Sequence, residues 1–244
     1  MKDRFPNVYE DAQRADAYAA LEFPGTYYLA YRDLPSILRE HVQGTKALDF
    51  GCGTGRSTRF LRELGYEAVG VDIAEHMVTK ARERDLDGEY HVVRDGALDQ
   101  FSPDAYSLVL SVFTFDNIAT MARKVALFRA LGRLTIPGTG RIMSLVSAPE
   151  IYKNEWASFT TKDFPENWSA KSGDKVLIVM LDVDDRRPVE DVFWTEEAYG
   201  EVYRRAGLVP LRTYRPLGKE TDPCNWVSET TISPWAIYVL ARVE

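Results

Sequence analysis

The feature that most constrains the fold is an alternation of short apolar runs with helical segments between residues 45 and 148. Five runs, rich in aliphatic and aromatic residues, have the length of buried strands: 46–50, 67–71, 90–93, 106–113 and 141–146. Three segments between them carry apolar residues at helical spacing: 57–64, 74–84 and 121–134. Strands that alternate with helices are joined by right-handed crossovers, so the sequence predicts an α/β domain with a doubly wound, Rossmann-like parallel sheet.

The flanks of this core have other patterns. Residues 1–44 are rich in tyrosine and helical by spacing, and we expect them to form a helical lid. Residues 149–192 are irregular and aromatic before they become β-like, and they predict a substrate cap inserted after the fifth strand. A run at 176–181 within this cap predicts either a strand of a small accessory sheet or an edge through which a homodimer forms.

The C-terminal part, residues 193–244, predicts a closing helix and a strand hairpin. Thr195 is a suitable N-cap and Gly207 a suitable C-terminal residue for the helix between them. Two β-like runs follow, 208–214 and 235–243, and we expect them to pair antiparallel at one edge of the sheet. No linker rich in Pro, Gly or Ser divides the chain, so a single domain over 1–244 is expected.

Composition restricts the partners and the metals. Lys and Arg total 30 against 37 Asp and Glu, so the net charge is −7 and gives no general attraction to nucleic-acid phosphates or to anionic membranes. Two cysteines and an N-terminal stretch without an apolar segment favour a cytoplasmic location. Three histidines are too few for a poly-histidine metal site, and two cysteines too few for a thiolate-rich zinc site.

A glycine-rich loop, Asp49-Phe50-Gly51-Cys52-Gly53-Thr54-Gly55, follows the first strand and opens the first helix. Glycines at this place allow a sharp turn and a close approach of a ligand to the backbone. Asp72 ends the second strand about twenty residues further on, where a carboxylate can bind both hydroxyls of a ribose. Asp95-Gly96-Ala97 follows the third strand and can reach the edge of an adenine.

Two kinds of cofactor compete for this arrangement. A dinucleotide site needs a third glycine at the position that Arg56 occupies, and no Tyr-x-x-x-Lys pair is present for hydride-transfer chemistry. S-adenosylmethionine has no phosphate but has a ribose, an adenine and an amino-acid tail. The carboxylate of Asp49 would repel a pyrophosphate, whereas it suits the ammonium of a methionyl tail.

Four runs along the chain together resemble those of the class I S-adenosylmethionine-dependent methyltransferases, in their bacterial small-molecule branch. The runs are A-L-D-F-G-C-G-T-G-R-S-T-R-F-L, G-V-D-I-A-E-H-M, R-D-G-A and Y-S-L-V-L-S-V-F. The resemblance covers about residues 45–148 and, more loosely, 193–244. It implies a seven-stranded sheet whose last strand is antiparallel. It also implies that S-adenosylmethionine lies across the carboxyl ends of the first four strands and leaves as S-adenosylhomocysteine.

The resemblance also implies a role for individual residues at these strand ends. Asp49 would order the loop and the donor ammonium through water or backbone, and Asp72 would bind the ribose diol. Gly51, Gly53 and Gly55 would pack under the methionyl and ribose parts of the donor. Ile73 and Met77 would flank the adenine, and the run Asp95-Gly96-Ala97 would lie at its edge. Ser111 and Phe113 would line the donor beside the methyl group.

The N-terminal tyrosines have two interpretations. Relatives use an N-terminal helix as a lid over the donor, which makes Tyr18 and Tyr28 candidates for a contact with the sulfonium and Arg32 a candidate partner of the donor carboxylate. Packing of the same side chains on the sheet is the alternative, and for any single tyrosine it is favoured.

Catalysis of methyl transfer needs the attacking atom held in line and water excluded. A general base is needed only where the acceptor arrives protonated, and Asp116 and Tyr152 are the candidate catalytic residues, with Glu155 and Tyr28 as alternatives. Ser111 stands where metal-dependent O-methyltransferases carry a carboxylate, so no metal is expected.

The sequence thus predicts methyl transfer from S-adenosylmethionine to a small-molecule acceptor, whose attacking oxygen, nitrogen or carbon stays open. An NAD(P)-dependent oxidoreductase and a non-catalytic S-adenosylmethionine-binding module are the alternatives. Nucleic-acid and membrane partners are not expected, since no basic stripe is present.

Overall fold

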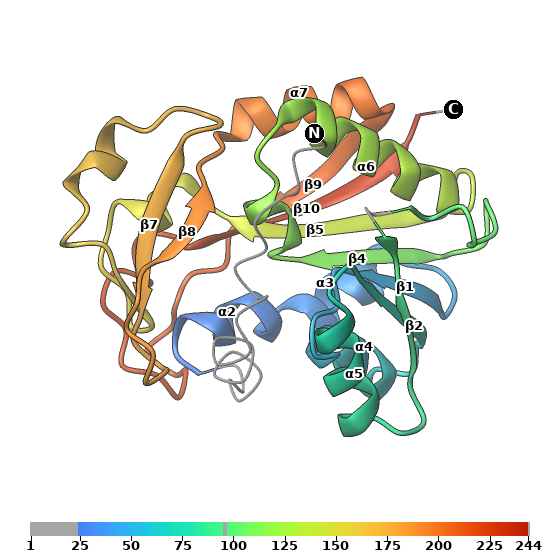
Figure 1. Cartoon of the computed structure of the whole chain (residues 1–244), viewed down its shortest axis with the longest axis horizontal. Coiled ribbons are helices and arrows are strands. Elements are labelled where there is room, and N and C mark those ends of the chain that lie inside the picture. Colours follow the sequence, from blue (N-terminus) through green and yellow to red (C-terminus); the bar gives the residue numbers. More distant parts are fainter. Residues whose placement is uncertain (1–23, 95–96, 244) are drawn as a thin grey trace.

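The centre of the molecule is a mixed seven-stranded sheet. In the computed structural model, which describes residues 24–94 and 97–243, its strand order is β3-β2-β1-β4-β5-β10-β9 (Figure 1). The strands are β1 Lys46–Phe50, β2 Glu67–Asp72, β3 Glu89–Val92, β4 Leu108–Val112, β5 Arg141–Ser147, β9 Leu208–Tyr214 and β10 Trp235–Arg242. Neighbours from β3 to β5 pair parallel, while β10 pairs antiparallel with both β5 and β9. The predicted seven-stranded sheet with an antiparallel last strand, and the hairpin at its edge, are confirmed.

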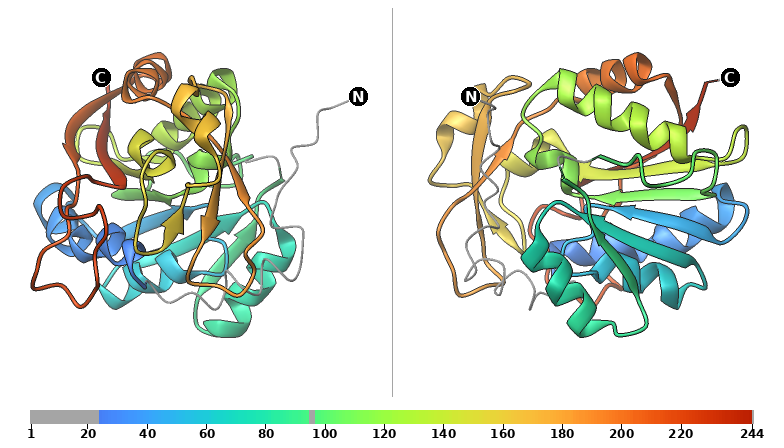
Figure 2. Two further views of the ribbon diagram at one scale, coloured as in Figure 1. Left: turned by 90° about the vertical axis from the view of Figure 1, so that its left-hand side faces the viewer. Right: turned by 45° about the vertical axis from the view of Figure 1, so that its right-hand side comes forward.

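Helices cover both faces of this sheet, as a doubly wound fold requires (Figures 1 and 2). The α-helices are α2 Thr26–Arg32, α3 Leu34–His41, α4 Arg56–Glu63, α5 Glu75–Arg84, α6 Met121–Leu134 and α7 Glu196–Ala206. Three 3₁₀ turns, η3 Thr114–Asn117, η4 Pro149–Tyr152 and η5 Pro165–Ser169, follow β4, β5 and β6. Both predicted ends of α7 are confirmed, since the Thr195 hydroxyl accepts from Ala198 N at 3.2 Å and Gly207 is left-handed at φ 77°.

Two hydrophobic cores lie on the two faces of the sheet, and β4 contributes to both. Leu108 and Leu110 belong to the core that includes α2 and α3, whereas Val109 belongs to the core under α6 and α7. A central strand buried on both faces cannot alternate polar with apolar residues, which explains the continuous apolar run in the sequence.

The insertion after β5 forms a second, three-stranded antiparallel sheet at the left of Figure 1. Its strands are β6 Phe159–Thr160, β7 Lys175–Met180 and β8 Val189–Val192, in the order β6-β7-β8. Val176 and Ile178 of β7 are buried in the core that also contains Trp235. The predicted run therefore forms the accessory sheet and has a partner strand on each side. The role of this insertion as a substrate cap stays a prediction.

The described part of the expected lid, residues 24–44, forms α2 and α3. Leu29 and Leu34 are fully buried, and Trp235 Nε1 donates to the carbonyl of Thr26 at 2.8 Å. These helices are therefore part of the main core. Coverage of the donor by the lid stays a prediction, and Tyr18 lies outside the described residues.

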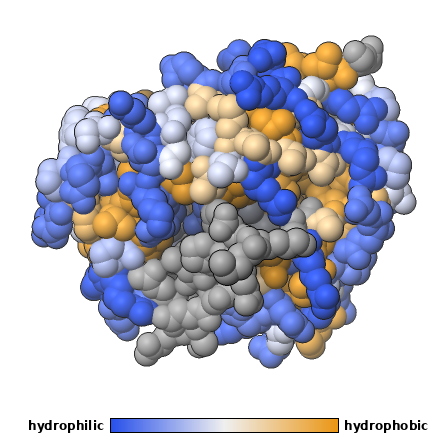
Figure 3. All heavy atoms as spheres, turned by 45° about the horizontal axis from the view of Figure 1, so that its top comes forward, coloured by the Kyte–Doolittle hydropathy of each residue, from blue (hydrophilic) through white to orange (hydrophobic). Residues whose placement is uncertain are grey.

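One face of the surface is shown in Figure 3, where apolar side chains come to the surface near the centre and hydrophilic ones surround them. In the part of the chain that the structure describes, no helix combines the length and the apolar character needed to cross a bilayer.

Candidate functional site

The glycine loop leaves β1 and turns against β2. The amides of Gly51 and Cys52 both donate to the carbonyl of Val71, at 2.8 and 3.0 Å. Gly51, Gly53 and Gly55 have φ angles of 78°, 53° and 82°, in the left-handed region that favours glycine. The glycines at these positions are thus required by the backbone of the turn.

The loop also stands directly against η3. A Cβ atom on Gly51 would lie 2.0 Å from Thr114 Oγ1, and this hydroxyl donates to the carbonyl of Phe50 at 3.1 Å. Phe113, just before η3, is itself left-handed at φ 59°, and its ring centroid lies 4.6 Å from that of Trp235. The ends of β1 and β4 are therefore locked together at the rim of the sheet.

Asp49 is fully buried at the base of the glycine loop. Its Oδ2 accepts from Ser57 Oγ and Thr58 Oγ1, both at 2.6 Å, in the first turn of α4. Its Oδ1 is buried and has no hydrogen-bond partner among the described residues. Burial raises the pKa of Asp49 to about 6. A buried carboxylate oxygen without a partner is costly, so the site favours a ligand or water that donates to it.

Asp72 ties the end of β2 to the glycine loop. Its Oδ2 accepts from Gly53 N at 2.9 Å and its Oδ1 from Ala74 N at 2.8 Å, while the residue stays partly exposed. Each carboxylate oxygen can accept a second hydrogen bond, which leaves room for two ribose hydroxyls. Burial raises the pKa of this carboxylate.

The predicted adenine contacts differ in exposure. Ile73 is half exposed, at 50%, whereas Met77 is buried, and its Cε lies 3.4 Å from a Cβ built on Gly53. Ala97 is exposed. Asp95 and Gly96 lie outside the described residues.

Ser111 lies one position inside the end of β4 rather than at the tip. It is fully buried, pairs in register with Ser144 of β5, and its Oγ has no partner among the described residues. Phe113 occupies the tip itself and is partly exposed. Lining of the donor by these two residues stays a prediction.

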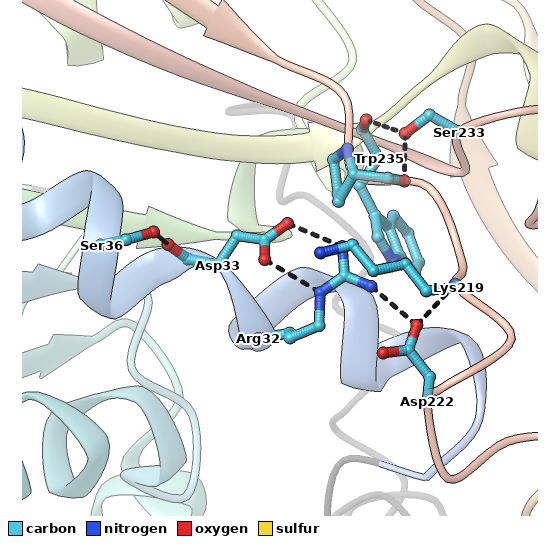
Figure 4. Close-up of polar contacts among 8 residues, drawn as sticks. Arg32, Asp33, Ser36, Lys219, Asp222, Ser233 and Trp235 are labelled. Carbon is cyan, nitrogen blue, oxygen red and sulfur yellow. Dashed lines mark hydrogen bonds and ion pairs between the residues drawn. The ribbon is translucent and has the colours of Figure 1, made fainter.

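Arg32 of α2 has carboxylate partners within the chain (Figure 4). Its Nε and Nη2 donate to Asp33 at 2.9 and 2.8 Å, and its Nη1 donates to Asp222 at 2.7 Å. Asp222 also accepts from Lys219 N at 2.7 Å, so the arginine fastens the β9–β10 loop to the start of α3. Tyr28, half-buried, faces Trp226 of the same loop at 6.5 Å between centroids. Their contacts with the donor stay predictions.

The two candidate catalytic residues lie at the end of β5. Asp116 of η3 is buried and accepts from Ser147 N and from Ser147 Oγ, the latter at 2.9 Å. Tyr152 of η4 is buried and its hydroxyl donates to Asp191 Oδ2 at 3.2 Å. The structure therefore brings both residues into the same region, next to the rim at η3.

Comparisons with known proteins agree with this architecture. Residues 47–138 match the family model described as a methyltransferase domain. An 18S rRNA (guanine-N(7))-methyltransferase from Bos taurus is 34% identical over 211 residues, which cover 72% of this chain and 75% of the relative. The chain belongs to the class I S-adenosylmethionine-dependent methyltransferases.

Two further comparisons extend the match. An N-demethylindolmycin N-methyltransferase from Streptomyces griseus is 25% identical over 82% of this chain and 84% of the relative. A structure of a SAM-dependent methyltransferase from Methanosarcina mazei superposes with a TM-score of 0.63, at 16% identity over 85% of this chain and 98% of that chain. Three other curated relatives are matched over shorter parts, and the chain spans 60%, 30% and 41% of their lengths.

Membership of this methyltransferase family confirms the predicted family and S-adenosylmethionine as its cofactor, with S-adenosylhomocysteine as the product. The residues present fit that donor: Asp49 offers a buried oxygen without a partner in the described structure, and Asp72 offers a partly exposed carboxylate beside the glycine loop. The individual site residues stay predictions.

Two charged residues near the rim were missed by the sequence reasoning, one of them buried and the other partly exposed. Lys124 of α6 is fully buried, and Asp191 of β8 accepts a hydrogen bond from the Tyr152 hydroxyl. Lys124 precedes Phe128 by four residues and therefore lies on the inner face of α6. This spacing is the sequence feature that could have indicated its burial.

Gly51→Ala should lower the free energy of unfolding by about 2–4 kcal/mol, through left-handed strain and the overlap with Thr114. Gly65→Ala is the matched control, because Gly65 is also left-handed at φ 92° but no atom of the described residues lies within 4 Å of its Cβ position. The control should lose about 1 kcal/mol. Urea denaturation measures both values, and equal losses would contradict the close approach of η3 to the loop.

Proposed function

We propose that this chain transfers a methyl group from S-adenosylmethionine to a small-molecule acceptor. The observation that carries the proposal is the pair of carboxylates at the glycine loop, one buried with an oxygen that has no partner among the described residues and one hydrogen-bonded to the loop backbone. Family membership supports the donor, and the geometry supports the place where it binds.

Each part of the donor has a group to hold it in this proposal. Asp72 binds the ribose hydroxyls while it keeps the Gly53 amide in place. Asp49 orders the donor ammonium through water or loop backbone, and the left-handed glycines let the methionyl part approach the backbone. When bound, S-adenosylmethionine supplies an electrophilic methyl group on its sulfonium. The protein contributes orientation and the exclusion of water.

The choice of a small acceptor rests on charge and on one relative. The net charge of −7 gives no general attraction to a phosphate backbone. The Streptomyces griseus relative is named for a small-molecule substrate, N-demethylindolmycin. The Bos taurus relative, named for 18S rRNA, makes methylation of RNA the second candidate.

Calorimetric titration of the whole chain with S-adenosylhomocysteine tests the donor half of the proposal. We expect saturable binding at one site and no heat with NADH. Absence of binding to folded protein would reject the proposal, and binding of NADH alone would favour the oxidoreductase.

Transfer of labelled methyl from S-adenosylmethionine tests the acceptor half. A cell extract is divided into a small-molecule fraction, an RNA fraction and a protein fraction. We expect label in the small-molecule fraction. Label in the RNA fraction would select the second candidate, and no label despite tight donor binding would favour a non-catalytic binding module.

A further inference from the structure

A lysine is buried beneath the rim of the proposed site. Lys124 is fully buried, and its Nζ donates to the carbonyl of Phe115 and, at 3.3 Å, to the hydroxyl of Tyr199. The rings of Trp194 and Tyr199 lie with their centroids 4.8 and 4.9 Å from Nζ. These contacts compensate only part of the cost of removing an ammonium from water.

Two carboxylates interact electrostatically with Lys124. Asp116 lies on η3 and Asp191 on β8, and their carboxylates accept hydrogen bonds from the hydroxyls of Ser147 and Tyr152 respectively. We call Asp116, Lys124, Asp191 and Tyr152 the buried cluster, in which Asp191 is partly exposed and the other three residues are buried. With all charges present it would carry a net charge of −1 in a medium of low dielectric constant, which favours retention of one proton on a carboxylate.

The pKa directions agree with this geometry. Burial raises the pKa of Asp191, and Asp116 and Glu190 raise it further, while Tyr152 and Lys124 oppose them. Burial also raises the pKa of Asp116 and lowers that of Lys124. The tyrosine hydroxyls that face the cluster, those of Tyr152, Tyr199 and Tyr203, have pKa values raised by burial and stay protonated.

The buried cluster joins the donor loop to the inserted sheet. Thr114 of η3 donates to the last residue of β1, and Asp116, two residues further on, is fastened to the end of β5. Tyr152 and Asp191 belong to the insertion that follows β5. The cluster therefore lies between the loop proposed to hold the donor and the segment expected to cover the acceptor.

We propose that Asp191 takes up, through the Tyr152 hydroxyl, the proton that the methyl acceptor loses, with Lys124 and Asp116 as positioning residues. This rests on the proposed function and narrows the acceptor to an amine or a hydroxyl compound. The lone pair of the acceptor nitrogen or oxygen forms a bond to the methyl carbon, and the carbon–sulfur bond breaks with its electron pair left on sulfur. The acceptor N–H or O–H proton moves to the Tyr152 oxygen as Tyr152 passes its own proton to Asp191 Oδ2.

The ionisation of the cluster is tested without an acceptor. Protein labelled with ¹³C at lysine Cε is titrated by NMR, and we expect Lys124 to titrate well below the exposed lysines. Asp191→Asn should lower its midpoint further, by about one pH unit, because an attracting charge is lost. Glu201→Gln, which removes a carboxylate from an exposed ion pair with Arg204 on α7, is the control and should leave the midpoint in place. A Lys124 midpoint among those of exposed lysines, or no shift in Asp191→Asn, would overturn the proposal.

The proton transfer itself is tested with labelled donor and a panel of amines and phenols as probes. Asp191→Asn and Tyr152→Phe should each lose about 10²- to 10⁴-fold in kcat and the acid limb of the pH–rate profile, while affinity for S-adenosylhomocysteine stays unchanged. Wild-type rates and pH–rate profiles in both variants would overturn the proposal. The proposal would also be overturned if wild-type protein binds S-adenosylhomocysteine but methylates none of these probes. Failure of wild-type protein to bind S-adenosylhomocysteine would instead reject the proposed function.

Discussion

Asp72→Ala should weaken the binding of S-adenosylhomocysteine by about 100-fold or more. The substitution removes the acceptor of two backbone amides, those of Gly53 and Ala74, and the proposed partner of the ribose hydroxyls. Hydrogen bonds to a charged group contribute about 1.5–3 kcal/mol each, and 2.7 kcal/mol corresponds to about 100-fold in affinity. Isothermal titration calorimetry of the folded variant measures the loss.

Two further variants separate the causes of that loss. Asp72→Asn keeps the volume and one acceptor oxygen, so its loss of affinity should lie between those of wild type and Asp72→Ala. Asp87→Ala removes an exposed carboxylate from the loop before β3 and should bind like wild type. Wild-type affinity in folded Asp72→Ala would remove Asp72 from the donor site.

Asp49→Asn should remove a pH dependence of stability that wild-type protein shows. In wild type, titration of Asp49 should lower the free energy of unfolding by about 3 kcal/mol as the pH rises from about 4 to about 6. The folded pKa of Asp49, about 6, lies above the value of an unfolded chain, so the folded state binds more protons in this window. The unfolding free energy therefore falls as the pH rises through it, and the loss is complete above pH 6. An asparagine has no such titration.

Urea denaturation of both proteins between pH 4 and pH 8 measures this difference. The free energy of unfolding of the variant should increase relative to that of wild type as the pH rises. The amide accepts the hydrogen bonds of Ser57 and Thr58 less well than the carboxylate does, which lowers the stability of the variant at every pH. It should also bind S-adenosylhomocysteine more weakly, because the ammonium loses a counter-charge. A difference between the two proteins that does not vary with pH would contradict the buried, protonatable state of Asp49.

The elements of the core could be predicted because each leaves a local pattern. The run at 46–50 and the helical spacing at 121–134 coincide with β1 and α6, since burial on one side or both fixes the periodicity. The left-handed turn after β1 could be predicted for a similar reason, because only glycine adopts such φ angles readily.

The parts that could not be predicted depend on residues far apart in the chain. Lys124 and Asp191 interact electrostatically although they belong to α6 and β8. The helical spacing places Lys124 on the inner face of α6, but no local pattern indicates which carboxylates lie near it. Arg32 pairs with Asp222, 190 positions away, across a loop without regular structure. Its charge and place in the sequence indicated a contact with the donor, which stays a prediction, but they did not indicate the ion pairs with Asp33 and Asp222.

A crystal structure of the whole chain with S-adenosylhomocysteine tests the central claim most directly. We predict the nucleoside at the carboxyl ends of β1 and β2, with both ribose hydroxyls on the Asp72 carboxylate and the tail ammonium linked to Asp49 Oδ1 through water or backbone. A complex in which the ligand lies elsewhere, with Asp72 bonded only to Gly53 and Ala74, would contradict the account.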